Sequence, residues 1–307
     1  MPPLLPLPGT APALPRRHWL QQAAAWPLAA LAGCAAPWPE VPPGPGSPSA
    51  RARLDDSAQA HGLAAFRRLK DVSLGLSPLA RGRPRPDDGP GALQWRCLPA
   101  RQLVAWHDSS LPQPQQGWRQ AVAGGLPESG EVRLWSAGQA VIDADRLVEA
   151  ARQADLLALL LLGPLLLAGT DRPVNWAEPT TLDGLRCDQL TLDLRPGLGG
   201  QGGSRLALFI DRDQGLLRRL RVLSDAEQGR PGAQAATWDL AQPLAWQGMV
   251  WPRRCQRVAP PLPGMAASAD GWLLHGLALD RGLLPADLDG PRFSARAAVP
   301  ATALPPA

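Results

Sequence analysis

The chain has no tyrosine, and Lys70 is the single lysine among its 31 basic residues, so arginine carries nearly all of the positive charge. It has 12 tryptophans but only 3 phenylalanines. Arginine in place of lysine, with tryptophan partly in place of tyrosine, indicates the codon bias of a GC-rich genome. The formal charge is only +4, and basic residues are mostly interleaved with acidic ones. The sequence therefore lacks a clustered phosphate-binding surface, and no nucleic-acid partner is predicted.

Charged residues are also few, at 19% of the 307 residues, against 45% hydrophobic residues. This balance excludes a collagen-like or a highly charged disordered chain and predicts a globular protein with polar tails. The 36 prolines and 31 glycines predict long loops or linkers, and the length suits one or two domains.

Cysteine is scarce and widely spaced. Cys34, Cys97, Cys187 and Cys255 form no C-x-x-C pair, which argues against a zinc site. The last three fall in predicted strands, where a small buried thiol is the default state. An oxidising compartment would permit one disulfide among them, and the sequence leaves its pairing open.

The spacings expected of a catalytic site are missing as well. No G-x-S-x-G elbow is present, and His61, His107 and His275 are predicted to be structural, although assembly of a site from distant positions stays open. A literal G-x-G-x-x-G occurs at 197–202, but residues 204–211 alternate like a strand, whereas a dinucleotide site needs a helix there. We therefore predict a hairpin loop at 197–202. For the protein as a whole, we predict no catalytic residue, no metal, no cofactor and no enzymatic activity.

The N-terminal residues resemble a bacterial lipoprotein signal peptide. Arg16 and Arg17 stand where a twin-arginine export motif has its arginine pair, and the apolar run 23–32 is shorter than the ~20 residues of a membrane span. The run ends in LAGC, which is similar to a lipobox, so the Cys34 thiol is predicted to accept a diacylglycerol and its freed amine a further acyl chain such as palmitate. A signal peptide over 1–33 follows, with the twin-arginine and the general export route both open.

The segment after the lipidated cysteine is rich in proline. Residues 34–50 are predicted to act as a tether that starts at the lipidated cysteine. Within it, 35–50 are predicted to form no helix or sheet and, at ~3.1 Å per residue, to reach roughly 50 Å. Ala35 is not the aspartate that retains enterobacterial lipoproteins in the inner membrane, and this resemblance implies the outer membrane, facing the periplasm. The tail 299–307 is rich in proline and alanine and is predicted to be disordered.

Two helices are predicted, over 55–69 and 143–162. Asp55 or Asp56 is expected to cap the first helix and Asp143 the second. The second helix runs into LLALLLLGPLLLA at 156–168, the most apolar stretch of the chain. Two interpretations of this stretch stay open: a buried helix end and loop, or a lid over an apolar cavity. The lid would be formed by Leu160, Leu162, Leu165 and Leu166.

The rest of the chain shows the residue pattern of β-strands. Short strands are predicted at 71–76, 93–98, 101–107 and 131–135, with proline- and glycine-rich loops at 81–91 and 111–117. From residue 174 onward strand follows strand, with 185–194, 204–211, 216–223, 235–240, 244–247, 249–257 and 271–279 joined by short turns. Strands without intervening helices predict an antiparallel meander. The predicted fold class is α+β, a curved antiparallel sheet forming an open or half barrel, with helices on its concave side.

Several short motifs resemble, in order and spacing, the C-terminal half of LolA/LolB-like proteins. They are Asp183–Gly184 before Cys187–Asp188, the strand end 209–211, Gly215–Leu216 and QGMVWP at 247–252. The resemblance covers about residues 55–293, within a predicted domain of 51–298. It implies a half-barrel whose open side is covered by helices, with an apolar space that binds lipoprotein acyl chains in the best-known members. No ligand residue of those members matches a position here.

Two functions are consistent with these observations. The first is a lipid-anchored, periplasm-facing protein that binds an apolar ligand, such as an acyl chain, a lipid or a lipoprotein. The second is a structural or interaction lipoprotein of the cell envelope with a filled core. The tryptophans spread through the domain are predicted to pack its core, and would suit acyl chains if several faced one cavity.

Overall fold

The computed structural model describes residues 45–80, 83–84, 92–121, 130–224, 235–258 and 271–289. The chain divides into two units, Met1–Trp38 and Pro39–Ala307, and all of the described residues belong to the second. Arg16, Arg17, Cys34, the signal peptide 1–33 and the tail 299–307 lie outside the described residues, as does most of the tether.

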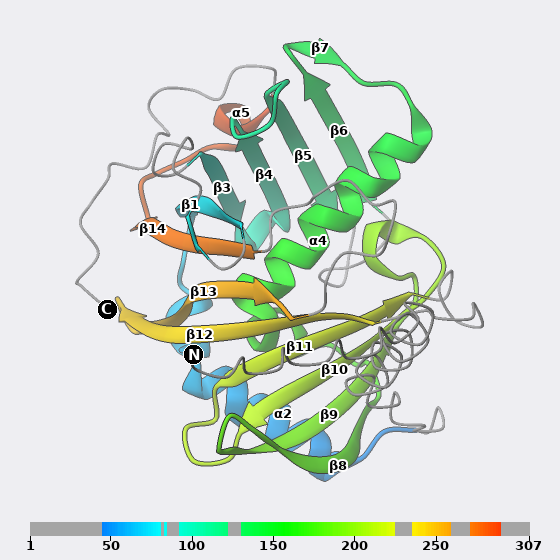
Figure 1. Ribbon diagram of the computed structural model, residues 1–307, viewed down its shortest axis with the longest axis vertical. Helices are drawn as coiled ribbons and strands as arrows, with labels where there is room; N and C mark the ends of the chain where they lie inside the picture. The colour runs from blue at the N-terminus through cyan, green and yellow to red at the C-terminus, as the bar shows by residue number, and fades with distance from the viewer. Residues whose placement is uncertain are drawn as a thin grey trace, which may run out of the picture. The chain divides into compact units, whose positions relative to one another are not determined.

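The strands form one antiparallel sheet in the order β7-β6-β5-β4-β3-β1-β14-β13-β12-β11-β10-β9-β8, with the short β2 paired to β1 off this path (Figure 1). Their bounds are β1 (Val72–Ala80), β2 (Arg83–Pro84), β3 (Leu93–Leu98), β4 (Leu103–Asp108), β5 (Gln115–Ala121), β6 (Gly130–Ser136), β7 (Gln139–Ala140), β8 (Val174–Leu182), β9 (Leu185–Leu194), β10 (Ser204–Asp211), β11 (Leu217–Ser224), β12 (Ala236–Trp246), β13 (Met249–Arg257) and β14 (Gly271–Leu279). The predicted antiparallel meander is confirmed.

Alternation of side chains explains this sheet. Leu190 and Leu192 of β9 lie directly opposite Leu208 and Leu206 of β10, and all four are buried on the same face. Successive residues of a strand point to opposite faces, so one face of each strand collects the apolar side chains. That face is the concave one, and it holds the main core.

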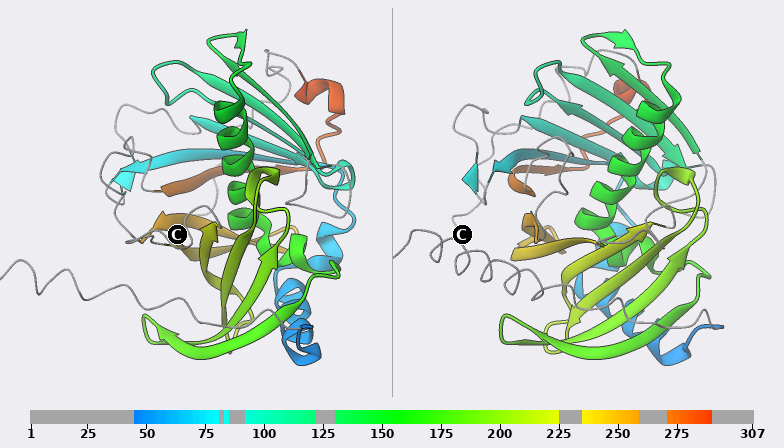
Figure 2. Two further views of the ribbon diagram at one scale, coloured as in Figure 1. Left: turned by 90° about the vertical axis from the view of Figure 1, so that its right-hand side faces the viewer. Right: turned by 45° about the vertical axis from the view of Figure 1, so that its right-hand side comes forward.

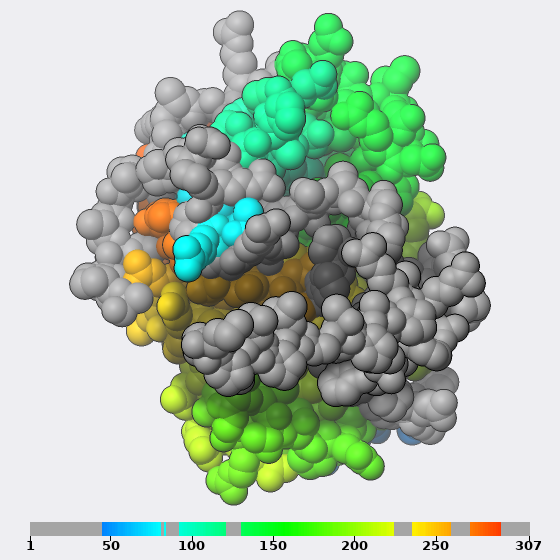
Figure 3. Space-filling view, in the orientation of Figure 1, coloured from blue at the N-terminus to red at the C-terminus, as the bar shows by residue number. Residues whose placement is uncertain are grey.

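The sheet is curved and does not close, because β7 and β8 are its two terminal strands (Figure 2). The junction between β13 and β14 is short: three residue pairs join them, from Arg254–Leu273 to Gln256–Gly271. We call β1, β3–β7 and β14 the upper strands and β8–β13 the lower strands. The space-filling view shows β12–β14, in yellow to orange, near the middle of the face that it draws (Figure 3). The fold class, an α+β open half-barrel, is as predicted.

The first helical region differs from the prediction. Helix α2 (Pro48–Ala60) begins seven residues before the expected start at 55, and the short α3 (Leu63–Phe66) follows it. The N-cap is Ser47, whose side chain accepts a hydrogen bond from Ala50 N, and not Asp55 or Asp56. Pro48 is compatible with the first helical turn, where no intrahelical N–H bond is needed. The prediction that the tether stays free of helix up to residue 50 is therefore wrong.

Helix α4 (Ala144–Leu167) is longer than the predicted 143–162, because the apolar stretch continues the helix through Pro164. Asp143 caps it as predicted, accepting from Arg146 N at 2.8 Å. Helix α4 is long and apolar enough to cross a membrane, but 83% of its apolar window is buried inside the fold, as in a core helix. It crosses the concave face obliquely, between the upper and lower strands (Figure 1).

Two strand predictions also need correction. Residues 111–117 were expected to be a loop, but Gln115–Ala121 form β5, which pairs with both β4 and β6. The separate strands expected at 235–240 and 244–247 are one strand, β12, with Gln242 at a φ of 55° before Pro243. The other elements are the 3₁₀ turns η1 (Pro99–Arg101) and η2 (Leu198–Gly200) and the helix α5 (Pro285–Leu288).

Candidate functional site

The apolar half of α4 is the centre of the candidate site. Leu160, Leu162 and Leu165 are at most 3% exposed, and Leu166 is partly buried. The leucines of this half divide between two core clusters. Leu157, Leu161, Leu162 and Leu165 pack in the first, whereas Leu156, Leu159, Leu160 and Leu167 pack in the second. The helix is therefore enclosed on both sides by apolar side chains.

The two clusters belong to different parts of the sheet. The first cluster is built mainly from the upper strands and the ends of β12 and β13, and contains Trp95, Trp106 and Trp251. The second is built from β8–β13 and from α2, through Ala50 and Leu54. Because α4 supplies leucines to both clusters, it fills the concave face between them.

A buried polar group holds the middle of α4. Arg119 of β5 donates from Nε to Asp155 Oδ1 at 3.0 Å and from Nη2 to Oδ2 at 3.1 Å, and Gly199 N donates to Oδ2 at 2.8 Å. Both side chains of the pair are at most 1% exposed. Burial raises the pKa of Asp155, although Arg119 and Gly199 favour its ionised form. We call Asp155, Arg119 and Gly199 the latch, because they join α4 to the sheet and to η2.

The glycine-rich segment contributes to this latch and does not precede a helix, unlike the loop of a dinucleotide fold. It forms a hairpin loop between β9 and β10, as predicted, and no helix follows it. Gly199 has a φ of +76°, and a Cβ there would lie 3.0 Å from Val148 O of α4. A glycine is thus required where the loop backbone approaches the helix.

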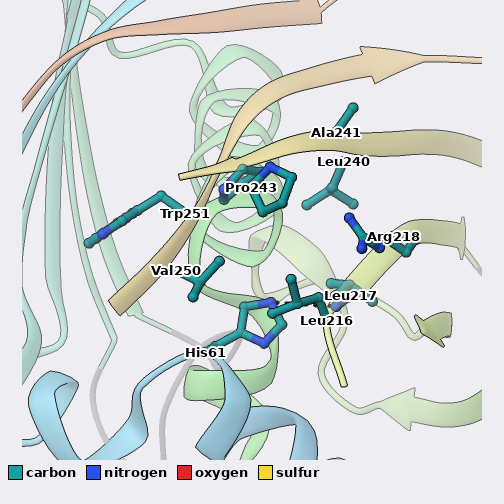
Figure 4. A pocket seen from close by; sticks show the side chains of 10 residues that line it. His61, Leu216, Leu217, Arg218, Leu240, Ala241, Pro243, Val250 and Trp251 are labelled. Carbon is teal, nitrogen blue, oxygen red and sulfur yellow. Dashed lines mark hydrogen bonds between the residues drawn. The ribbon is translucent and has the colours of Figure 1, made fainter. Parts of the chain in front are cut away.

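His61 lies beside a small cavity at the end of α2 (Figure 4). Its Nδ1 lies 2.8 Å from Ser57 O, and its Nε2 accepts from Leu217 N at 3.4 Å, so the ring joins α2 to β11. Burial lowers the pKa of His61, and the charge of Arg218 adds to this effect. The cavity measures about 20 Å³, which is room for a water molecule and not for an acyl chain. His61 is structural, as predicted.

A larger depression lies on the surface, at the start of α2. It is an open groove of about 410 Å³, formed by residues 45–48, Arg51, Asp55 and the segment 169–174. Arg51 donates to the backbone oxygens of Leu167 and Arg172. These bonds join α2 to the last residue of α4 and to the segment that follows it. The groove contains both acidic and basic side chains and does not reach the apolar half of α4.

The three cysteines among the described residues are buried thiols. Cys97, Cys187 and Cys255 are buried and unpaired, on β3, β9 and β13. Burial raises the pKa of Cys97 and of Cys255 to about 12, so neither thiol is an available nucleophile. Within the described ranges, no group of three or more metal-ligating side chains comes together.

Comparisons with known proteins give a fold resemblance without a family assignment. No protein-family model matches the chain, and no curated protein matches it. A DUF1329 family protein from Desulfovibrio piger is 10% identical with a TM-score of 0.45, and a LolA superfamily protein from Nitrosomonas europaea is 11% identical with a TM-score of 0.44. A domain from Vibrio parahaemolyticus, described as outer membrane lipoprotein-sorting, is 8% identical with a TM-score of 0.42. Each alignment covers 78% of this chain and 97% of the other.

The structures to which this chain is similar thus include a member of the LolA superfamily, and the sequence motifs resemble LolA/LolB-like proteins. Identities of this size bear on the fold alone and carry no activity over.

The latch was not predicted from the sequence. Asp155 is the last acidic residue before the apolar stretch, and Arg119 lies 36 positions earlier in a segment partly expected to be a loop. The one available signal was a lone aspartate inside an otherwise apolar helical face, which in a buried helix requires a partner.

Proposed function

We propose that this protein is a lipid-anchored, periplasm-facing envelope protein that binds an apolar ligand between the concave face of its sheet and α4. One observation carries the proposal: the most apolar segment of the chain fills the concave side of an unclosed sheet as a single helix between two apolar clusters. Displacing that helix by its own diameter would expose two apolar walls. Apolar ligands bind such walls at ~25 cal/mol per Å² without charged contacts.

In the described structure the site is closed. Ligand pockets usually measure ~300–1,000 Å³, whereas the cavity beside His61 measures about 20 Å³. Binding therefore requires α4 to move. Two positions along the chain suit such a motion, the Gly163–Pro164 pair within the helix and Gly169 after its end, and the latch at Asp155 is the buried polar contact that would have to open.

The binding test measures both the ligand and the motion. The chain from residue 34 on, carrying Cys34→Ala and free of detergent, is titrated with a fluorescent fatty-acyl probe. We expect saturable binding of one probe per chain, with faster hydrogen exchange of the amides of 156–167 and little change in β9 and β10. The reason is that α4 must leave the sheet, whereas these lower strands keep their partners on both sides.

A matched pair of variants locates the site. Leu166 is partly buried against the first cluster, so Leu166→Asp adds a charge at the sheet–helix interface at a position that is not fully enclosed. Ile142→Asp adds the same charge just before α4, where the side chain is 93% exposed. Leu166→Asp is expected to weaken probe binding at least tenfold and Ile142→Asp to leave it unchanged. Equal effects of the two variants would argue against α4 as part of the site.

The anchor is proposed on the sequence alone. The LAGC quartet after an apolar run with basic residues before it supports lipidation of Cys34, and Ala35 supports the outer membrane. Cys34→Ala is expected to move the protein from the membrane to the soluble fraction, or to leave it unprocessed. Labelling with radioactive palmitate, together with membrane fractionation, measures this. Cys97→Ala is the control and should stay membrane-bound, since Cys97 is buried in the core; a Cys34→Ala protein that still fractionates with membranes would refute the anchor.

A second candidate function is an interaction module with a filled core. It is favoured by the two apolar clusters that enclose α4 and fill the concave face with the protein's own side chains. If the fatty-acyl probe does not bind and hydrogen exchange in 156–167 stays unchanged, this second function replaces the first.

A further inference from the structure

The open groove at the start of α2 has no part in the proposed binding of an apolar ligand. It lies where α2 meets the segment that follows α4, and α2 and β8 are together at the lower end of the domain (Figure 1). Its volume of about 410 Å³ is within the ~300–1,000 Å³ that is usual for ligand sites. Its charged side chains are two cations and two carboxylates, namely Arg51, Arg172, Asp55 and Asp171. The groove is therefore neutral overall and presents both signs of charge to an occupant.

The two carboxylates of the groove have no partner. Arg51 and Asp55 lie one turn apart on α2, a spacing at which an arginine and an aspartate can form an ion pair. Arg51 is held by backbone oxygens instead, since it donates from Nη1 to Leu167 O at 3.3 Å and from Nη2 to Arg172 O. Within the part of the chain that the structure describes, neither Asp55 nor Asp171 has a hydrogen-bond or ion-pair partner. The groove therefore holds two carboxylates that lack a cation, beside a guanidinium whose Nε still lacks an acceptor.

This arrangement matches a zwitterion that carries a primary ammonium and a phosphate. An ammonium has three N–H donors and can bond to both carboxylates, whereas the guanidinium of Arg51 suits a phosphate. The phosphoethanolamine headgroup of a phospholipid has these two groups joined by a short link. A choline headgroup has the same charges, but its trimethylammonium has no hydrogen to donate. An anionic headgroup without an ammonium would meet the two carboxylates uncompensated.

The place where the chain enters the domain selects the membrane as the source of this headgroup. Pro45 lines the groove, and Cys34 is eleven positions earlier, so the chain between them spans at most ~40 Å. Trp176 lies at the same end of the domain and is 38% exposed. Its Nε1 donates to Ser49 Oγ at 2.9 Å, and Ser49 Oγ is 2.9 Å from Ser47 Oγ on the groove wall. A half-exposed indole with its N–H bonded is typical of a membrane–water interface.

We propose, on the basis of the lipid anchor in the proposed function, that this groove binds the headgroup of a phosphatidylethanolamine on the surface of the anchoring membrane. Asp55 and Asp171 accept hydrogen bonds from its ammonium, Arg51 donates to its phosphate, and Trp176 lies at the level of the headgroups. A weak contact is sufficient, because the anchor makes it intramolecular, with an effective concentration on the order of millimolar. The contact orients α2, β8 and the C-terminal end of α4 toward the membrane.

The test compares vesicles that differ only in their headgroups. The chain from residue 34 on, carrying Cys34→Ala, is sedimented with vesicles of phosphatidylcholine, or of phosphatidylcholine mixed with phosphatidylethanolamine or with phosphatidylglycerol. We expect the phosphatidylethanolamine vesicles to bind about tenfold more tightly than the other two, the ratio expected from about one charge-assisted hydrogen bond. All three share the same acyl chains, so the preference measures the headgroup and not the apolar ligand.

Variants locate this preference in the groove. Asp55→Asn together with Asp171→Asn should abolish the preference and keep the fold, because neither carboxylate has a partner to lose. Asp145→Asn, in the exposed first turn of α4, is the matched control and should keep the preference. In ¹H–¹⁵N spectra, soluble glycerophosphoethanolamine should shift the indole signal of Trp176, and glycerophosphocholine should not. Trp176→Phe assigns this signal.

The outcomes separate this inference from the proposed function. Equal binding to the three kinds of vesicle, or tightest binding to phosphatidylglycerol, would overturn the inference. So would a response to soluble glycerophosphoethanolamine without any preference among vesicles, because the groove would then not act on a membrane. The fatty-acyl probe and the fractionation of Cys34→Ala test the apolar ligand and the anchor independently. A headgroup preference without probe binding would therefore refute the apolar ligand alone, and probe binding without a headgroup preference would refute the groove alone.

Discussion

Asp155→Ala is expected to lower the free energy of unfolding by about 3–5 kcal/mol, because it leaves the buried guanidinium of Arg119 without its carboxylate. It also removes the acceptor of Gly199 N, so η2 loses its bond to α4. Urea denaturation followed by circular dichroism measures the change. Since the latch holds α4 against the sheet, the same variant should raise the rate of hydrogen exchange in 156–167 well before global unfolding.

Two controls isolate the buried charge as the cause. The first is Glu149→Ala on the same helix, which breaks a pair with Arg152 whose side chains are 47% and 38% exposed and should cost no more than about 1 kcal/mol. The second is the double variant Arg119→Met with Asp155→Leu, which replaces both charges by apolar groups and should recover much of the lost stability. A double variant as unstable as Asp155→Ala would show that packing, and not the unpaired charge, dominates.

Gly62→Ala is expected to lower the free energy of unfolding by about 3–5 kcal/mol, through backbone strain and overlap together. Gly62 has a φ of +92°, and a Cβ there would lie 2.1 Å from Gly248 O and 2.9 Å from Met249 Cα. Both contacts are with backbone, so no side chain can move aside. The substitution would separate α2 and α3 from the β12–β13 turn and disturb His61, whose carbonyl accepts from Val250 N at 3.2 Å.

Gly184→Ala is the matched control for this variant. Gly184 has a φ of +84°, close to that of Gly62, but a Cβ there meets nothing within 4 Å. It should cost only the left-handed backbone penalty of about 1–2 kcal/mol. The difference between the two variants measures the close approach of α3 to the β12–β13 turn. Equal losses would mean that the backbone conformation alone accounts for the effect.

Local patterns predicted most of the sheet. The strands at 185–194 and 204–211 were predicted within a residue, because period-two alternation of leucine with polar residues is a signal contained in each strand. Strand β5 was missed, because Gln115, Gln116 and Gly117 have no strand signal of their own. Its pairing with β4 and β6 supplies the stabilisation, and a Cβ at Gly117 would overlap the ring of Trp106. Glycine there is a packing requirement that only the neighbouring strand reveals.

The start of α2 is a second feature that the local composition did not predict. Ser47 followed by Pro48 is a helix-start signal, but it lies at the end of a proline-rich segment that favours extended chain. The helix forms there because Ala50 and Leu54 are buried in the second cluster, and Ser47 N bonds to Val174 O. Tertiary contacts outweighed the local composition.

The sequence by itself determined the antiparallel strand succession, the apolar character of 156–167 and the small buried thiols, since each depends on the order of neighbouring residues. Only the tertiary structure decided that this segment continues α4 and lies between two clusters, and that Asp155 meets Arg119 and Gly199. Those contacts join residues 36 and 44 positions apart, and they exist because sheet register and the approach of η2 bring them to one point.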